Sequence, residues 1–373
     1  MTDQWFKVDR VFDGQAIHKL AAIHVRDGRV VGLRTNDFPA AAEQMHGVLS
    51  PGLVDLQVNG GGGVLLNNDP TAEAMQKIVN AHRKFGTTAI MPTVITDHPD
   101  VLSRVADAAI DAIKLPGIVG LHIEGPHIAT ERRGTHRAEF IRPLDDHTIN
   151  IVGRLRQADI PVILTLAPEI ATVKQIEQLA DMGSLVSIGH TNATAQMVRD
   201  AIAAGASCAT HLYNAMSPMT GREPGVTGAV INSNLYAGII CDGHHVDDEM
   251  VAMAIRARPL PDRMFLVSDS MSTVGGPDHF DLYGQRIALK NGRLINSEGN
   301  LAGAHVTLAQ SIKRLVERAG IPLHDALRMA TLVPATCVGK PELSSLMGRS
   351  VDDLVVFDNA FSVGSLSTVL PTQ

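Results

Sequence analysis

The sequence predicts an α/β fold, a (β/α)8 TIM-type barrel with a small β-sandwich domain beside it. Eight short runs in the middle of the chain are rich in leucine or β-branched residues, and most are continuously apolar rather than alternating. Such runs are typical of parallel strands buried on both faces. Stretches with helical spacing separate most of the runs, and eight strand-then-helix units fit a barrel. A doubly wound open sheet is the alternative.

The two ends of the chain have a different pattern. Short β-like runs occupy residues 5–14, 21–33, 45–52 and 350–358, with Asp-Gly turn pairs among the first of them. We therefore expect residues 1–49 and 341–373 to form one small β domain and residues 50–340 to form the barrel. Two unrelated edge hairpins are the alternative.

The middle of the chain predicts its elements in a regular order. The expected barrel strands lie within residues 52–60, 87–96, 117–126, 161–169, 185–193, 208–216, 237–246 and 264–271. Helical spacing covers residues 71–86, 99–114, 172–183 and 194–205. Gly86, Gly183 and Gly205 stand where helices should end, since glycine adopts the left-handed conformation of a C-terminal cap without strain. After the last strand, Asn291-Gly292 predicts a hairpin turn, and residues 304–320 predict another helix.

Composition narrows the class of protein. The 373 residues include 32 basic and 39 acidic side chains, a net charge of −7, which argues against a general surface for nucleic acid or anionic lipid. The three cysteines are scattered and odd in number, so a disulfide scaffold is not expected. The first ten residues lack the apolar segment of a signal peptide, and no apolar run reaches the roughly 20 residues of a spanning helix. We expect a cytoplasmic protein.

Polar side chains follow several of the expected strands, at the end where active sites of such barrels lie. Glu124, His190 and His211 end three of the runs, and one carboxylate with two imidazoles is a set that holds a catalytic metal. Asp269 ends the last run and could serve as a general base. Each residue alone has an ordinary structural role as an alternative. His122, His127 and His244 are interpreted as supporting residues.

Several motifs together carry a family resemblance. The segments HIEGPHI, RRGTHRAEF, IGHTNAT, THLYNAMSPMTGREPG, CDGHHVD and LVSDSM resemble the N-acetylglucosamine-6-phosphate deacetylase family of the amidohydrolase superfamily. The resemblance extends from about residue 50 to residue 303. It implies that Glu124, His190 and His211 bind a divalent metal and that Asp269 is catalytic. Zinc is the metal expected, with iron and cobalt as alternatives, because all three suit one carboxylate and two imidazoles. The resemblance also implies a homodimer, and it assigns substrate contacts to Thr135, His136, Asn214, Ala215, Arg222, His245, Leu301, Ala302 and Gly303.

One departure concerns the first strand. Many amidohydrolases carry His-x-His there to bind a second metal, whereas this chain has Gln57 and Asn59. Amides are poor zinc ligands beside imidazole and carboxylate. We therefore expect a single metal, with Gln57 and Asn59 as hydrogen-bonding residues around it.

The resemblance implies hydrolysis of N-acetyl-D-glucosamine 6-phosphate to D-glucosamine 6-phosphate and acetate. Arg222 would clamp the phosphate, because a planar guanidinium can bind it through two hydrogen bonds. The alternatives are an amidohydrolase acting on a related N-acylated sugar phosphate, on a cyclic amide or on a nucleobase, and a scaffold without turnover. The sequence leaves epimers of the hexosamine open.

Overall fold

The main sheet contains eight parallel strands. The structure, a computed structural model, describes residues 3–369. In order across the sheet the strands are β5 (Leu53–Val58), β8 (Thr87–Ile95), β9 (Leu121–Glu124), β10 (Val162–Leu166), β11 (Leu185–Ile188), β12 (Cys208–Ala209), β13 (Tyr236–Ile239) and β14 (Met264–Leu266). Each of the eight predicted runs contains one of them. Every residue of β5 and β8 is buried, as expected for strands covered on both faces.

The first and last strands of this sheet approach each other. Val58 forms a parallel bridge with Ser270, and the backbone N–H of Asp269 donates to the carbonyl of Gln57 at 3.0 Å. The sheet is therefore nearly closed into a barrel, which brings Gln57 at the end of β5 beside Asp269 after β14.

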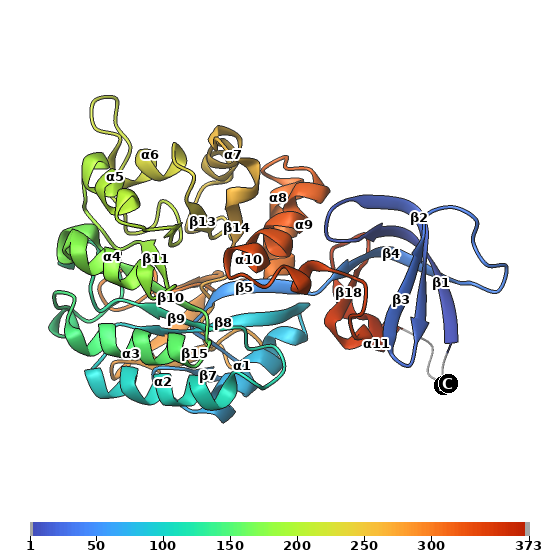
Figure 1. Cartoon of the computed structure of the whole chain (residues 1–373), viewed down its shortest axis with the longest axis horizontal. Coiled ribbons are helices and arrows are strands. Elements are labelled where there is room, and N and C mark those ends of the chain that lie inside the picture. The colour runs from blue at the N-terminus through green and yellow to red at the C-terminus, as the bar shows by residue number, and fades with distance from the viewer. Residues whose placement is uncertain (1–2, 370–373) are drawn as a thin grey trace.

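Helices surround the sheet in the order that the sequence predicts (Figure 1). Those that follow the strands are α1 (Ala72–Arg83), α2 (Pro99–Ala112), α3 (Asp146–Gln157), α4 (Val173–Asp181), α5 (Ala195–Ala203), α6 (Gly225–Ile231), α7 (Asp248–Ala257) and α8 (Leu308–Glu317), with α9 (Leu323–Ala330) and α10 (Leu332–Cys337) after them. Threonine hydroxyls cap several N-termini; Thr172 and Thr307 complete capping boxes. Gly183 and Gly205 have φ of 78° and 104°, so the predicted helix ends are confirmed.

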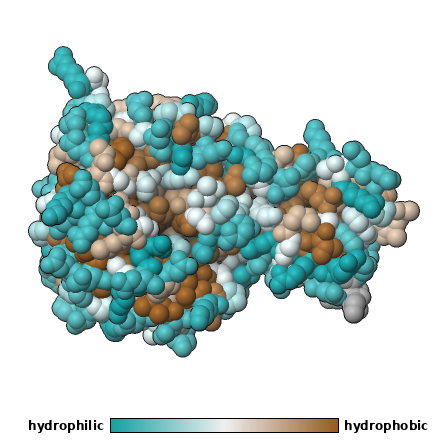
Figure 2. Space-filling view, in the orientation of Figure 1, coloured by the Kyte–Doolittle hydropathy of each residue, from teal (hydrophilic) through white to brown (hydrophobic). Residues whose placement is uncertain are grey.

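A second sheet joins the two ends of the chain. Its six strands run in the order β19 (Val363–Ser365), β18 (Leu354–Phe357), β4 (Glu43–Pro51), β1 (Asp3–Phe12), β2 (Ile17–Arg26) and β3 (Arg29–Arg34), and α11 (Leu366–Val369) follows β19. Phe6, Ile23, Leu49 and Leu354 belong to its own hydrophobic core. Figure 1 shows this sheet beside the barrel, and Figure 2 shows hydrophilic residues over much of the visible face of both parts.

The predicted hairpin insertion is also present. Strands β15 (His279–Leu282), β16 (Gln285–Lys290) and β17 (Arg293–Leu294) form a small antiparallel sheet, and a two-residue pair, β6 (Gly60–Gly61) with β7 (Val64–Leu65), follows β5. Asn291 and Gly292 have φ of 51° and 77°, as a tight hairpin turn requires. Among the helices of residues 3–369, none has both the length and the apolar composition needed to cross a membrane.

Candidate active site

A cavity of about 260 Å³ opens at the carboxyl ends of the barrel strands. It contains most of the residues that the sequence singles out, although they are spread over 245 positions between Asn59 and Gly303. Its lining consists of Asn59, Ile95, Glu124, Glu131, Arg132, Gly134, Thr135, His136, His190, His211, Asn214, Ala215, His245, Asp269, Met271, Asn300, Leu301 and Gly303.

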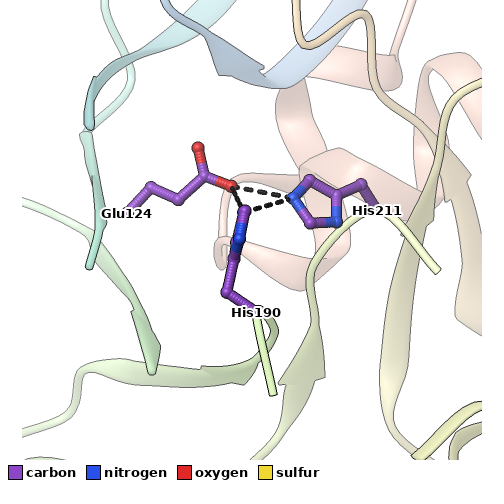
Figure 3. Close-up of side chains that lie close together, drawn as sticks. All are labelled: Glu124, His190 and His211. Atoms are coloured by element: carbon purple, nitrogen blue, oxygen red, sulfur yellow. Dashed lines mark hydrogen bonds and ion pairs between the residues drawn. The ribbon is translucent and has the colours of Figure 1, made fainter. Parts of the chain in front are cut away.

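Glu124, His190 and His211 converge in this cavity (Figure 3). Glu124 Oε1 lies 2.9 Å from Nε2 of His211 and 3.2 Å from Nε2 of His190, and the two Nε2 atoms are 3.0 Å apart. All three side chains are buried. Glu124 ends β9, whereas His190 and His211 lie just after β11 and β12, so three strands of one sheet each supply one candidate ligand.

The chemistry of these donors fits a divalent metal. His190 Nδ1 lies 2.8 Å from the carbonyl oxygen of Arg132, which can only accept, so this nitrogen carries the proton. In the neutral ring, the lone pair of His190 Nε2 then points toward Glu124. Two electron-pair donors facing each other in a buried site need a cation between them, and one carboxylate with two imidazoles suits zinc, iron or cobalt.

Without a metal, protons on the imidazoles would supply the positive charge that these groups need. Burial by itself would raise the pKa of Glu124, but the hydrogen bonds and charges of His190 and His211 hold that pKa well below its usual range. Burial would lower the pKa of His211, and the interaction with Glu124 raises it instead. The carboxylate is therefore available as an anionic ligand.

Asp269 lies beside this cluster and is held by two amides, Gln57 of β5 and Asn59 just after it. Its Oδ1 accepts hydrogen bonds from Asn59 Nδ2 at 2.7 Å and Gln57 Nε2 at 3.2 Å. Gln57 Nε2 also donates to Glu124 Oε1 at 2.9 Å, so one amide group bridges the two carboxylates. Burial first, and the negative charge of Glu124 second, raise the pKa of Asp269 to about 6.

The backbone at these positions is unusual. His190, His211 and Asp269 have φ of 48°, 30° and 49°, in the left-handed region that non-glycine residues seldom adopt. Each such residue costs on the order of 1–3 kcal/mol and persists where the surrounding structure holds it. Backbone strain at three residues whose side chains face one cavity marks that cavity as a functional site.

Most of the predicted substrate-contact residues line the cavity, but Ala302 and Arg222 do not. Thr135, His136, Asn214, Ala215, His245, Leu301 and Gly303 line the cavity. His245 Nδ1 is 2.7 Å from Asp242 Oδ2, which fixes the ring. Ala302 is fully buried beneath its neighbours, and Arg222 is exposed on the loop before α6; neither lines the cavity of the single chain.

Sequence reasoning missed Arg132, the one arginine or lysine among the residues that line the cavity. Its Nε donates to Asn192 Oδ1 at 3.0 Å, which leaves its terminal nitrogens for a ligand. The sequence feature that could have identified Arg132 is the Arg-Arg pair directly before Gly134, Thr135 and His136.

The histidines that the sequence assigns a supporting role make structural contacts. His122 hydrogen-bonds to Leu56 O and Thr165 Oγ1, and His127 hydrogen-bonds to Arg142 O and Thr148 Oγ1.

Fold and site together define a barrel enzyme with a cluster able to hold a metal at the ends of its strands. The model of the amidohydrolase family matches residues 48–369. The chain belongs to the amidohydrolase family.

Characterised relatives cover most of the chain. It is 39% identical over 349 residues to the N-acetylgalactosamine-6-phosphate deacetylase of Shewanella sp. strain ANA-3, covering 91% of this chain and 88% of the other. It is 35% identical over 322 residues to the N-acetylglucosamine-6-phosphate deacetylase of Haemophilus influenzae, covering 84% of each. A mutant of the N-acetyl-D-glucosamine-6-phosphate deacetylase of Mycobacterium smegmatis, solved in complex with N-acetyl-D-glucosamine-6-phosphate, has a TM-score of 0.89, 29% identity and 97% coverage of both chains. The resemblance expected from the sequence is confirmed.

Proposed function

We propose that this protein is a metal-dependent amide hydrolase that converts N-acetyl-D-glucosamine 6-phosphate and water to D-glucosamine 6-phosphate and acetate. The observation that carries the proposal is the convergence of Glu124, His190 and His211 in one cavity with Asp269. The relatives named above support the choice of substrate class. Zinc is the proposed metal, with iron and cobalt as the alternatives to test.

The chain's own residues account for the proton transfers. A divalent metal held by Glu124, His190 and His211 supplies Lewis acidity, which polarises a carbonyl and lowers the pKa of water. Asp269 accepts the proton of the attacking water at its carboxylate and returns it to the amine nitrogen as the C–N bond breaks. His136 lies beside His190 and is placed to donate a hydrogen bond to the acetyl oxygen.

The kcat/KM of the enzyme should fall at low pH, with an acid limb set by the protonation of Asp269. A general base acts only as the carboxylate, so kcat/KM should fall about tenfold per pH unit below its pKa. That pKa is raised to about 6 by burial and by Glu124. A bound cation favours the carboxylate and lowers the value, so we expect the limb at about pH 6 or below. A kcat/KM profile of the zinc-loaded enzyme checks this; a limb above about pH 7 would contradict the assignment.

The phosphate end of the substrate needs a cation. We propose that Arg132 supplies it within one chain, together with Asn214, Ala215 and His245. Arg132→Gln should raise KM for the phosphorylated sugar by roughly 10–150-fold, since a hydrogen bond to a charged group contributes about 1.5–3 kcal/mol. Unphosphorylated N-acetylglucosamine should change little.

Two comparisons sharpen this test. Arg222→Gln should give the same selective loss if the exposed arginine reaches the phosphate through loop movement or from a second copy of the chain. Arg137→Gln is the control, because Arg137 pairs with Glu139 at 2.8 Å outside the cavity lining. Equal losses for both sugars in Arg132→Gln would mean that Arg132 holds the loop through Asn192 rather than the phosphate.

The galactosamine epimer is the second candidate substrate, because the 39% identical relative is named for it. The epimers differ only in the configuration of one ring hydroxyl. Acetate release from N-acetylglucosamine 6-phosphate and N-acetylgalactosamine 6-phosphate, measured as kcat/KM, decides between them. We expect the glucosamine substrate to have the higher value; the reverse order would reassign the enzyme.

We also propose the domain boundaries, the cellular location and the oligomeric state of the protein. The parallel bridge from Val58 to Ser270 supports a complete (β/α)8 barrel over residues 50–340. One six-stranded sheet joins β4 and β18, which supports a single small β domain of residues 1–49 and 341–373, of which 1–2 and 370–373 lie outside the described residues. Three free cysteines support a cytoplasmic location. A homodimer is proposed from the family resemblance and is tested by its mass in solution.

A further inference from the structure

Thr96 is a buried residue in direct contact with His136. It follows β8 and is 1% exposed, and its Oγ1 lies 2.7 Å from Nδ1 of His136. The His136 ring is 3% exposed, and its centroid lies 4.4 Å from that of the candidate metal ligand His190. His136 lines the cavity, and because Thr96 occupies Nδ1, Nε2 is the nitrogen available to a ligand.

The hydrogen bonds of Thr96 decide which nitrogen of His136 carries the proton. The hydroxyl has one hydrogen to donate and two acceptors nearby: His136 Nδ1 at 2.7 Å and the carbonyl oxygen of Glu124 at 3.5 Å. A bond at 3.5 Å is at the limit of hydrogen-bond distance, whereas 2.7 Å is optimal for an O–H donor. If the hydroxyl instead accepted a hydrogen bond from Nδ1–H, its own buried hydrogen would have only the 3.5 Å contact to the Glu124 carbonyl, so the better-satisfied arrangement has the hydroxyl donating to Nδ1. A neutral ring that accepts at Nδ1 carries its proton on Nε2.

The surroundings hold Thr96 in this position. The hydroxyl of Tyr283, from the turn between β15 and β16, donates to the carbonyl of Thr96. The Thr96 hydroxyl packs against Gly125, where a Cβ atom would lie only 2.3 Å from Oγ1. Gly125 has φ of 75°, so a glycine there both permits the backbone and leaves room for the hydroxyl.

We propose that Thr96 is a positioning residue that holds His136 as the Nε2–H tautomer, so that His136 presents a hydrogen-bond donor to the acetyl oxygen of the substrate. The tautomer follows from the protein geometry alone, whereas the identity of the acceptor rests on the proposed function. The opposite tautomer would present a lone pair to an oxygen that gains negative charge during hydrolysis, which is repulsive.

The tautomer can be measured without substrate or turnover. Long-range ¹⁵N–¹H correlation spectra of the zinc-loaded protein distinguish a protonated from an unprotonated ring nitrogen, and His136→Gln identifies the His136 signals by their loss. We expect a protonated Nε2 and an unprotonated Nδ1. A protonated Nδ1 would overturn the proposal, whatever substrate the enzyme takes.

Kinetics of hydroxyl variants test the consequence. Thr96→Val keeps the shape but removes the hydroxyl, and should lower kcat about 10–100-fold with a much smaller change in KM, the usual effect of losing a partner that orients a functional ring. Thr96→Ser keeps the hydroxyl and should restore most of kcat. Thr88→Val is the matched control on β8, because the buried Thr88 hydroxyl has no hydrogen-bond partner within residues 3–369.

The outcomes separate the two proposals. If Thr96→Val retains wild-type kcat, or if Thr96→Ser is as slow as Thr96→Val, the positioning role of the hydroxyl is wrong. If wild-type enzyme releases no acetate from either hexosamine phosphate, the proposed function is wrong, while the spectra still decide the tautomer. If Thr96→Val does not fold, the wild-type spectrum and Thr96→Ser remain decisive.

Discussion

Asp269→Asn is expected to lower turnover roughly 10²–10⁴-fold, the usual contribution of a positioned general base. The asparagine oxygen can still accept the hydrogen bonds that Asn59 and Gln57 donate to Asp269 Oδ1. The site should therefore keep its shape while losing the group that takes a proton from water. Metal content and substrate affinity should stay close to those of the wild type.

Single-turnover rates and substrate binding, measured on the same zinc-loaded preparation, check this expectation. The acid limb of the pH profile should also disappear, because the titrating carboxylate is gone. A variant that keeps more than about a tenth of wild-type turnover would exclude Asp269 as the base, since loss of a base costs at least about a hundredfold.

Removal of a metal ligand should have an equally large effect. Glu124→Gln and His211→Asn each take one donor from a buried set of three, and both should lose bound metal and activity together. His305→Asn is the matched control, since His305 hydrogen-bonds to Thr273 outside the cavity lining. Elemental analysis after dialysis against metal-free buffer measures the metal retained.

The same analysis should find one metal per chain in the wild type. Gln57 places amide hydrogens between Glu124 and Asp269, where a second cation would otherwise offset the two carboxylates. Amide groups donate hydrogen bonds there but add no negative charge, so a second dication would be poorly neutralised. Two equivalents that are both required for full activity would contradict this account. Gln57→His combined with Asn59→His should gain a second, weaker equivalent.

Much of the fold was predictable because buried parallel strands leave a strong signal. All eight apolar runs contain a strand, and the Asn291-Gly292 turn has the positive φ values that its residues favour. The small strands β6 and β7 were not predicted, since two-residue strands in a glycine-rich loop carry no periodicity.

The site was predictable where it depends on strand ends. Glu124, His190, His211 and Asp269 lie at the carboxyl ends of β9, β11, β12 and β14, and the barrel closure forces them together. Arg132 and Thr96 were missed for a different reason. The position of Arg132 depends on how the loop after β9 folds back over the cavity, and Thr96 acts through a hydroxyl that any buried threonine shares. Local pattern carries neither kind of information.

The most direct test of the central claim is hydrolysis of N-acetylglucosamine 6-phosphate by the zinc-loaded protein in ¹⁸O-labelled water. Attack of water on the acetyl carbon predicts one ¹⁸O atom in each acetate released and one free amine formed per acetate. Chelation of the metal should stop the release, and added zinc should restore it. Failure to release acetate from this sugar and from its galactosamine epimer, or release that is indifferent to the metal, would contradict the account.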